Sequence, residues 1–452
     1  MKNLLSTFLF LGGAAGLQTI KKDVVIVGGG SSGIYTGISL MDKGKDVVII
    51  EKSDIIGSHA NTYYDPVSKT PRNVGVQSLH NVSVVRDYLT RLNVTAGPYI
   101  SYSAQTTLNV DYITGLEVKN YIAPNISAVV AGWEAFRSII QEKYGYLDDG
   151  FFLPDPVPKE LLMPFSEFSN KYGFDAILPS LATVIEPVEV WKESTLYVIK
   201  NFGIESIDAQ LAFATSGGFV PRDVNDIYFS AAKILGSRVL LNSTVQSVKR
   251  SNDGVTVVVK TPTGRICYEA DKIIMAAPPL IRNFAGWDLS SNEAQLFGKF
   301  QSKNTHIGIT RNPEWNNVNI NGVGPSYAST TARLPGTVST TPTGFSDSSY
   351  YSYICFIGEA SVQHAQTLYQ SEIKKLIANG VLPESKNEIV EWFNHNQYMN
   401  YVSNDDIKAG FYTKLNNLQG TSSTYYVGAA WAGQDSSYIW GACKRLLPKL
   451  LA

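Results

Sequence analysis

The chain has 452 residues, more than one ordinary domain needs, so two sequential or intertwined domains are expected. Hydrophobic residues make up 44% and charged residues only 17%, which describes a well-buried globular protein and excludes an intrinsically disordered one. The 38 basic and 39 acidic residues nearly cancel and form no long basic run, so nothing favours nucleic-acid binding.

The first predicted element is a secretory signal peptide over residues 1–17. Lys2 supplies positive charge, residues 4–11 form a short apolar core, and residues 12–16 are small. A buried strand and a membrane anchor are the alternatives. No other segment has the ~20 apolar residues that a membrane-spanning helix requires. We therefore expect a secreted protein with no transmembrane anchor after signal removal.

The sequons indicate the compartment of the protein, and the cysteines and histidines indicate whether it has disulfides or a metal site. Four Asn-x-Ser/Thr sequons agree with passage through a glycosylating compartment and predict a glycoprotein, although such triplets also arise by chance. The three widely spaced cysteines predict at most one disulfide, and the five scattered histidines predict no metal site. The sequons begin at Asn81, Asn93, Asn125 and Asn242.

Residues 23–51 have the pattern of a dinucleotide-binding unit. An apolar strand at residues 24–27 leads into a glycine-rich turn. A helix with one apolar face follows, and a second apolar strand at residues 47–50 ends at Glu51. Strand, turn, helix, strand and acid stand in the order that a dinucleotide requires. The segment therefore predicts a nucleotide-cofactor enzyme.

Each glycine of the turn has a separate physical role. Gly28 permits the sharp bend, and Gly30 lets the backbone approach a pyrophosphate. Gly33 lets the helix lie close to the sheet, so that its N-terminus faces the phosphate charge. Glu51 lies where a carboxylate accepts hydrogen bonds from ribose hydroxyls.

The same domain is expected to resume after residue 210. The predicted elements are a helix at 225–235, strands at 238–241 and 245–250, a hairpin of 255–260 and 264–269, and a buried strand at 271–277. The chain then closes with a strand at 425–427 and an amphipathic helix capped by Asp435 and Ser436.

We therefore predict an α/β fold with a Rossmann-like nucleotide-binding domain, discontinuous in sequence, and a second α+β substrate lobe. The nucleotide-binding domain takes residues 20–80, 211–280 and 401–452, and the lobe takes residues 81–210 and 281–400. Residues 349–358 of the lobe predict a strand. Its tyrosines at 351 and 353 are interpreted as sheet packing in preference to a substrate wall.

The glycine pattern does not separate NAD from FAD. Two features favour flavin. A secreted enzyme cannot rely on a nicotinamide pool, whereas a flavin travels within the fold. The C-terminal helix also offers a second N-terminus, which suits the partial negative charge at the N1–C2=O edge of a reduced flavin ring.

The chain resembles the FAD-dependent amine oxidase superfamily, which includes the monoamine oxidases, and within it the fungal β-cyclopiazonate dehydrogenase (oxidocyclase) family. The resemblance covers nearly the whole mature chain. It is carried by the glycine turn with Glu51, by GSHANTYYDPVSKTPRNVGVQSLHN at 57–81, by LLNSTVQSVKR at 240–250 with DKIIMAAPP at 271–279, and by residues 410–440.

This resemblance implies an amine oxidase/glutathione reductase-type fold and a flavoprotein oxidoreductase of secondary metabolism. Such an enzyme removes hydride from an amine or alkaloid-like molecule, in C–N or C–C oxidation or oxidative cyclisation. Its partners would be a small-molecule substrate and an electron acceptor, with oxygen as one candidate.

The resemblance also implies which residues contact FAD. The implied contacts are Ser31, Ser32 and Gly33 on the pyrophosphate, Glu51 on the adenosine ribose, the Val245 backbone on the adenine, Gly75, Val76 and Gln77 along the flavin ring or ribityl chain, and Gly428, Ser436 and Ser437 over the ring. Ordinary turn and cap roles stay open for Gln77 and Ser436.

The chain departs from the amine oxidase pattern at two sites. Where amine oxidases usually carry Gly-Gly-Arg, Gly57 is followed by Ser58 and His59, so a weaker, titratable donor replaces an arginine. Ala429 replaces an acid that contacts the ribityl chain.

No cysteine stands where the monoamine oxidases tether their flavin, and Cys443 is predicted to be a core residue. FAD is therefore expected to be non-covalent, with a tether through His59 or His80 as the alternative.

No catalytic residue is assigned from the sequence. Lys303 is the one lysine that could hold a water near flavin N5, and a solvated surface lysine is the preferred interpretation. Two other functions stay open. One is a flavin-dependent isomerase or desaturase of a fatty acid or isoprenoid, and the other is a non-catalytic flavin-binding protein.

Overall fold

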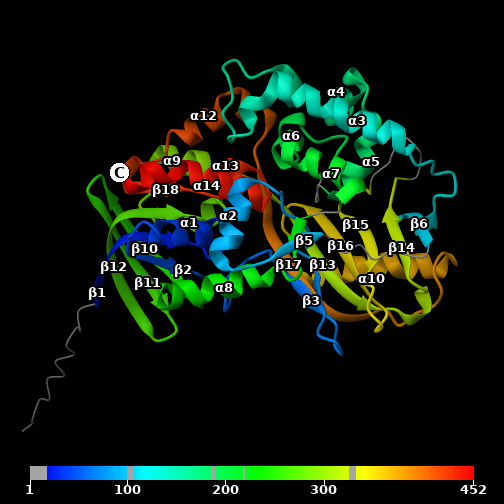
Figure 1. Ribbon diagram of the computed structural model, residues 1–452, viewed down its shortest axis with the longest axis horizontal. Coiled ribbons are helices and arrows are strands. Elements are labelled where there is room, and N and C mark those ends of the chain that lie inside the picture. The colour runs from blue at the N-terminus through cyan, green and yellow to red at the C-terminus, as the bar shows by residue number, and fades with distance from the viewer. Residues whose placement is uncertain (1–17, 99–105, 185–188, 217–218, 325–331) are drawn as a thin grey trace, which may run out of the picture.

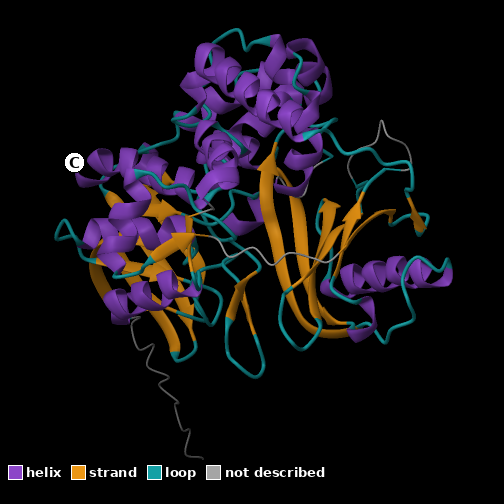
Figure 2. Ribbon diagram, turned by 45° about the vertical axis from the view of Figure 1, so that its right-hand side comes forward, coloured by secondary structure: helices purple, strands orange, loops and turns teal. Residues whose placement is uncertain are grey.

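The computed structural model describes residues 18–98, 106–184, 189–216, 219–324 and 332–452. The predicted signal peptide lies outside these residues. The described chain contains two seven-stranded sheets, with helices α3 to α7 at the top of the view in Figure 1. Figure 2 shows the two sheets side by side, with the helical group across their upper ends.

The first sheet is built around β1 (Thr19–Val27), which is parallel to both of its neighbours, β2 (Val47–Ile50) and β12 (Gly264–Met275). The strand order is β10-β11-β12-β1-β2-β9, and β18 pairs with β12. The other strands are β9 (Val239–Leu240), β10 (Thr244–Ser251), β11 (Gly254–Thr261) and β18 (Thr424–Tyr426).

Two strands of this sheet differ from their predicted bounds. The strands expected at 264–269 and 271–277 are one strand, β12, because β11 pairs with its first half and β1 pairs in parallel from Cys267 to Met275. The same ladder extends β1 back to Thr19, which pairs with Cys267, whereas the apolar pattern begins only at Val24.

Five helices pack together beside this sheet. Tyr35 of α1 stacks on Trp440 of α14 with ring centroids 6.1 Å apart, and Tyr88 of α2 meets both rings edge-on. Cys443 is buried in the same core, as predicted. The helices are α1 (Ser31–Met41), α2 (Ser83–Leu92), α8 (Asn225–Leu235), α13 (Ala429–Ala432) and α14 (Ser436–Leu451). The predicted division assigns α2 to the lobe, but α2 packs with the helices of the nucleotide-binding unit.

The second sheet has the order β17-β13-β16-β15-β14-β6-β7, and α10 (Val362–Ala378) packs on one face of it. The strand predicted at 349–358 is confirmed as β16 (Ser349–Ile357). The other strands are β6 (Thr106–Asp111), β7 (Leu116–Glu117), β13 (Gln301–Arg311), β14 (Val318–Gly322), β15 (Gly336–Pro342) and β17 (Glu388–Tyr401).

The helical group between residues 126 and 216 is held by aromatic packing. Phe136, Phe165, Phe168 and Phe174 are fully buried in one cluster, with the Phe136 and Phe174 rings 5.0 Å apart. Its members are α3 (Ile126–Ile139), α4 (Phe165–Tyr172), α5 (Leu178–Val184), α6 (Thr195–Asn201) and α7 (Ile204–Ser216).

Smaller elements complete the described chain: the pairs β3 (Thr62–Tyr64) with β4 (Pro71–Asn73) and β5 (Ala96–Pro98) with β8 (Phe219–Pro221), and the helices α9 (Ser291–Phe297), α11 (Asn404–Lys408) and α12 (Phe411–Asn416). Within the parts that the structure describes, no helix has the length and apolar character to cross a bilayer. The three cysteines are all free thiols.

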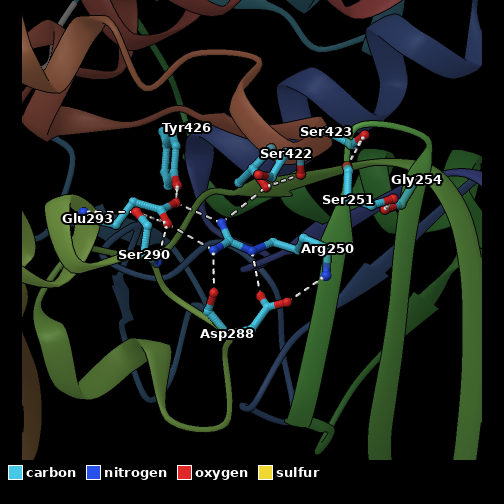
Figure 3. Close-up of polar contacts among 10 residues, drawn as sticks. Arg250, Ser251, Gly254, Asp288, Ser290, Glu293, Ser422, Ser423 and Tyr426 are labelled. Atoms are coloured by element: carbon cyan, nitrogen blue, oxygen red, sulfur yellow. Dashed lines mark hydrogen bonds and ion pairs between the residues drawn. The ribbon is translucent and has the colours of Figure 1, made fainter.

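A buried ion network joins β10, β18 and the start of α9 (Figure 3). Arg250 donates to Asp288 at 2.8 Å and to both carboxylate oxygens of Glu293 at 2.7 and 2.9 Å. Tyr426 donates to Glu293 at 2.7 Å, and Ser290 completes a capping box with the same carboxylate. Burial raises the pKa of Glu293, but the hydrogen bonds from Arg250 and Tyr426 outweigh it and lower the pKa to about 2.

Replacing Arg250 by Met tests this network. The change leaves Glu293 buried without its cation, so the free energy of unfolding should fall by about 3–5 kcal/mol. Because the folded pKa of Glu293 lies below its ordinary value of 4.5, its contribution is present above pH 4.5 and is lost as the pH falls toward 2. Urea unfolding at pH 7 and pH 3 measures both effects.

Arg137→Met is the matched control, since the pair of Arg137 with Asp208 lies at the surface. Equal unfolding midpoints for Arg250→Met and Arg137→Met would contradict the assigned role of the network.

Candidate functional site

One cavity of about 350 Å³ lies between the two sheets and the helical group. Its volume is within the range of about 300–1,000 Å³ typical of ligand pockets. The glycine turn, residues 57–59, 75–78, 80 and 276–279, and the α13–α14 region form one part of its wall. Residues of α5 to α8, β13, β16 and β17 form the other part.

The predicted residues divide between those that border the cavity and those that do not. Gly30, Ser31, Ser32, His59, Gly75, Val76, Gln77, Gly428 and Ser436 border it. The remainder, Gly28, Gly33, Glu51, Val245 and Ser437, do not border it.

The glycine turn brings the start of α1 against the end of β1. Gly28 has a φ of +113°, and a Cβ on Gly33 would lie 2.0 Å from the Gly28 carbonyl oxygen, so glycine is required at both positions. Gly30 is the N-cap of α1 and provides no side-chain cap. The first N–H groups of α1 therefore remain available to an anionic group in the cavity.

Glu51 is fixed at the end of β2 by backbone donors. Its carboxylate accepts from Gly29 N–H at 2.6 Å and from Ser53 N–H at 2.8 Å. Its carbonyl oxygen accepts from Ser243 N–H at 2.8 Å. Val245 on β10 follows Ser243 by two residues. The carboxylate thus lies beside the glycine turn, and its contact with the ribose stays a prediction.

The segment at residues 75–77 lies against the loop that contains His59. A Cβ on Gly75 would lie 2.1 Å from the His59 carbonyl oxygen, so no larger residue fits there. The Gln77 amide donates to the Tyr353 hydroxyl, which in turn donates to the Val74 carbonyl at 2.8 Å.

The two tyrosines of β16 have different surroundings. Tyr353 packs against the cluster that contains Ile307 and Tyr351, as expected, and it also borders the cavity. Tyr351 is buried beneath Arg72, which donates to its hydroxyl at 3.2 Å, as expected for packing.

The start of α14 also reaches the cavity. Asp435 caps the helix, as predicted, by accepting from Ser437 N–H at 2.7 Å and Tyr438 N–H at 3.3 Å. Ser436 borders the cavity and its hydroxyl lies 3.2 Å from that of Ser31. Ser437, predicted to lie over the ring, does not border it, because its hydroxyl accepts from His80 N–H at 3.0 Å.

His59 does not supply the positive charge of the arginine that it replaces. Burial lowers its pKa to about 4, so the ring is neutral near pH 7. It stacks on His395 of β17, with centroids 4.6 Å apart, and burial lowers the pKa of His395 well below its ordinary value. His395 Nε2 lies 2.6 Å from the Asn61 amide oxygen, which fixes Nε2 as the protonated nitrogen.

Lys303 is neither a surface lysine nor a cavity lysine. Its side chain is 6% exposed, is ion-paired with Glu193, and lies 5.0 Å from the centre of the Tyr401 ring. The cavity wall contains Thr305 of the same strand but no lysine or arginine among the described residues.

Sequence reasoning missed most of the wall that β17 supplies. The pairing of β17 with β13 shifts register between Lys303 and Thr305, and Gln397 has a left-handed φ of 62°. Polar side chains inside a strand (NHNQ at 394–397) are the one signal that could have indicated this wall. The missed residues are His395, Gln397, Tyr398 and Asn400.

Comparisons with known proteins identify the family. The family model described as flavin containing amine oxidoreductase matches residues 31–283, more than half of the chain. FAD-dependent oxidoreductase oblC of Cochliobolus heterostrophus is 35% identical over 96% of this chain and 92% of its own length. This chain belongs to the flavin-containing amine oxidoreductases. Another relative, the β-cyclopiazonate dehydrogenase of Aspergillus oryzae, is 32% identical over 99% of this chain and 97% of its own. The protein is therefore an FAD-dependent oxidoreductase, as predicted.

Solved structures confirm the predicted fold. A CLA-producing fatty acid isomerase from P. acnes superposes with a TM-score of 0.76 at 16% identity, covering 95% of this chain and 99% of that one. Putrescine oxidase bound to putrescine gives a TM-score of 0.68 at 14% identity, covering 96% and 99%. At these identities the likeness shows the fold alone.

The cavity fits FAD on its own features. The start of α1, which has no side-chain cap, and the start of α14, which Asp435 caps, meet at its wall, and Gly30, Gly75 and Gly428 have no side chain there. Three buried polar atoms of residues on the wall have no protein partner: Asn400 Nδ2, Gln434 Oε1 and His80 Nδ1. Buried polar atoms are normally paired, so a ligand rich in donors and acceptors belongs here.

Replacing Glu51 by Ala tests the ribose assignment. Loss of charge-assisted hydrogen bonds should weaken FAD binding by about 10- to 100-fold. Titration of the FAD-stripped protein measures the affinity, and Glu167→Ala, an exposed glutamate on α4, is the control. Acid precipitation of the wild type should also release all flavin into the supernatant.

Unchanged FAD affinity in Glu51→Ala would exclude the ribose contact. A yellow pellet after acid would show a covalent bond and direct attention to His59 and His80.

Proposed function

We propose that this enzyme removes hydride from a nitrogen-containing, alkaloid-like small molecule or an amine. The net reaction would be C–N or C–C oxidation, with oxidative cyclisation as one outcome. The observation that carries the proposal is the mixed wall of the cavity. Beyond residues 75–77 it combines aromatic and carboxamide side chains, namely Phe202, Tyr353, Tyr398, Asn201, Gln210, Gln397 and Asn400.

This wall suits a flat, hydrogen-bonding molecule. Aromatic faces bind ring systems, and neutral amides pair with the N–H and C=O groups of a heterocycle without a full charge. The name of the relative β-cyclopiazonate dehydrogenase points to the same kind of substrate.

Bound FAD supplies the two-electron acceptor for the substrate hydride. The residues of this chain supply binding and orientation. Gln77 and Tyr353 are hydrogen-bonded to each other on the wall, and the neutral rings of His59 and His395 stack beside Tyr398. Fixed side chains of this kind orient a substrate and exclude water from the reacting carbon.

A fatty-acid isomerase or desaturase is the second candidate, because the fold also resembles a fatty acid isomerase. A free fatty acid carries a carboxylate and a long alkyl chain. The described wall has no lysine or arginine for the carboxylate and interleaves amides with its apolar residues. These features favour the first candidate. Family membership as an oxidoreductase argues against the non-catalytic alternative.

Anaerobic spectroscopy of the holoenzyme separates the two candidates. Indole alkaloids and aromatic amines should bleach the flavin bands, whereas linoleic acid should not. Tyr398→Leu should raise KM about 3- to 10-fold by loss of ring contacts, and Tyr146→Leu, partly exposed away from the wall, should leave KM unchanged. Turnover of linoleic acid with no bleaching by any nitrogenous compound would replace the first candidate by the second.

The same proposal includes secretion and N-glycosylation. All four sequon asparagines are exposed, and Asn93 and Asn242 stand in turns with left-handed φ values of 55° and 50°. Exposed turns are accessible to a glycosylating enzyme.

Expression in a fungal secretory host should place the protein in the medium, and glycosidase treatment should lower its mass. Asn93→Gln and Asn242→Gln should each remove part of that difference. Deletion of residues 1–17 should retain the chain inside the cell without glycans. Secretion of the deleted form would contradict the signal assignment.

A further inference from the structure

A second set of polar residues borders the cavity beside the start of α14. It consists of His80, Ser206 of α7, and Asp435, with Tyr438 behind them. His80 and Ser206 are each 6% exposed, so their polar atoms depend on one another or on a bound molecule for partners.

The contacts of His80 are unequal at its two ring nitrogens. Nε2 lies 3.1 Å from the Ser206 hydroxyl, which lies 3.3 Å from the Tyr438 hydroxyl. Nδ1 is buried without a hydrogen-bond partner, and the nearest carboxylate oxygen, Asp435 Oδ1, is 3.8 Å away. The ring meets the edge of the Tyr438 ring, with centroids 5.0 Å apart, and the backbone N–H of His80 donates to the Ser437 hydroxyl.

This geometry suits a ring that takes up a proton. When Nδ1 carries the hydrogen, it faces the Asp435 carboxylate, and Nε2 accepts from the Ser206 hydroxyl. A proton on Nε2 makes an imidazolium beside that carboxylate, and Nε2 then donates to Ser206. The charged groups that face this cluster are Asp435 at the start of α14 and, on α7, Glu205, which acts on Tyr438.

We propose that His80 accepts the proton that the substrate releases during oxidation, with Asp435 stabilising the resulting imidazolium and Ser206 holding the ring. This role rests on the proposed function. The substrate carbon gives up a hydride, with both electrons of its C–H bond, to bound FAD. The neighbouring N–H or O–H gives its proton to the Ser206 hydroxyl on the cavity wall, that hydroxyl gives its own proton to His80 Nε2, and a C=N or C=O bond forms.

His80→Gln is the decisive variant, because Gln can still bond to Ser206 but cannot take up a proton. It should retain FAD at wild-type affinity, while the rate constant of flavin reduction by substrate falls about 10²- to 10⁴-fold. The pH profile of that rate constant should differ from the wild-type profile. Added imidazole should restore activity to His80→Ala.

His364→Gln, an exposed histidine on α10, is the matched control and should change none of these quantities. Wild-type rates and an unchanged pH profile in His80→Gln with FAD retained would overturn the proposal. A slow His80→Ala that imidazole does not restore would assign His80 a structural role only.

The flavin midpoint potential can be measured without substrate, so it tests the role of His80 whatever the substrate is. Chemical reduction of bound FAD also adds negative charge to the cavity, so a proton acceptor on its wall takes up a proton as the electrons enter. The dependence of the flavin midpoint potential on pH should therefore change slope in the wild type and not in His80→Gln. Superimposable curves would overturn the proposal for His80. A slope change that depends on His80, without bleaching by any nitrogenous compound, would refute only the proposed substrate class.

Discussion

The close approach of α1 to the turn after β1 is the constraint on which the rest of the site depends. With a Cβ on Gly33 only 2.0 Å from the Gly28 carbonyl, the helix can lie in this position only if that side chain is absent. The contact aims the first N–H groups of α1 into the cavity and brings Ser31 within hydrogen-bond distance of Ser436 on α14. The starts of two helices more than 400 residues apart in sequence therefore border one cavity.

The second contribution comes from strands that never pair with the nucleotide-binding sheet. β13, β16 and β17 belong to the other sheet, yet each places side chains on the same cavity as the glycine turn. The helical group closes the space above them through α6 and α7. In the proposed function, one unit would hold the cofactor and the other would shape the substrate space.

The nucleotide-binding unit could be predicted from the sequence because its glycines, helix and terminal acid stand at a fixed spacing. Contacts within one short segment require the glycines. The substrate wall could not be predicted. Tyr351 and Tyr353 are two residues apart on one strand, and this spacing is the same whether a side chain packs in the core or borders a cavity. Their partners differ only in the folded chain, where Tyr353 contacts Val74 and Tyr351 contacts Arg72. His395 and Tyr398 reach the cavity through a register shift, and Lys303 is neutralised by Glu193, a residue 110 positions away. Such placements depend on tertiary contacts that no local pattern encodes.

The hydroxyl of Tyr353 joins the two units chemically. It donates to Val74 and accepts from Gln77, so a residue of the substrate wall also holds the backbone segment assigned to the flavin. Substrate preference and cofactor environment are therefore not separate modules in this protein. An effort to redesign the pocket by enlarging or shrinking position 353 would also move the support of the cofactor, whereas changes at Gln210 or Val184 leave that hydrogen-bonded pair untouched.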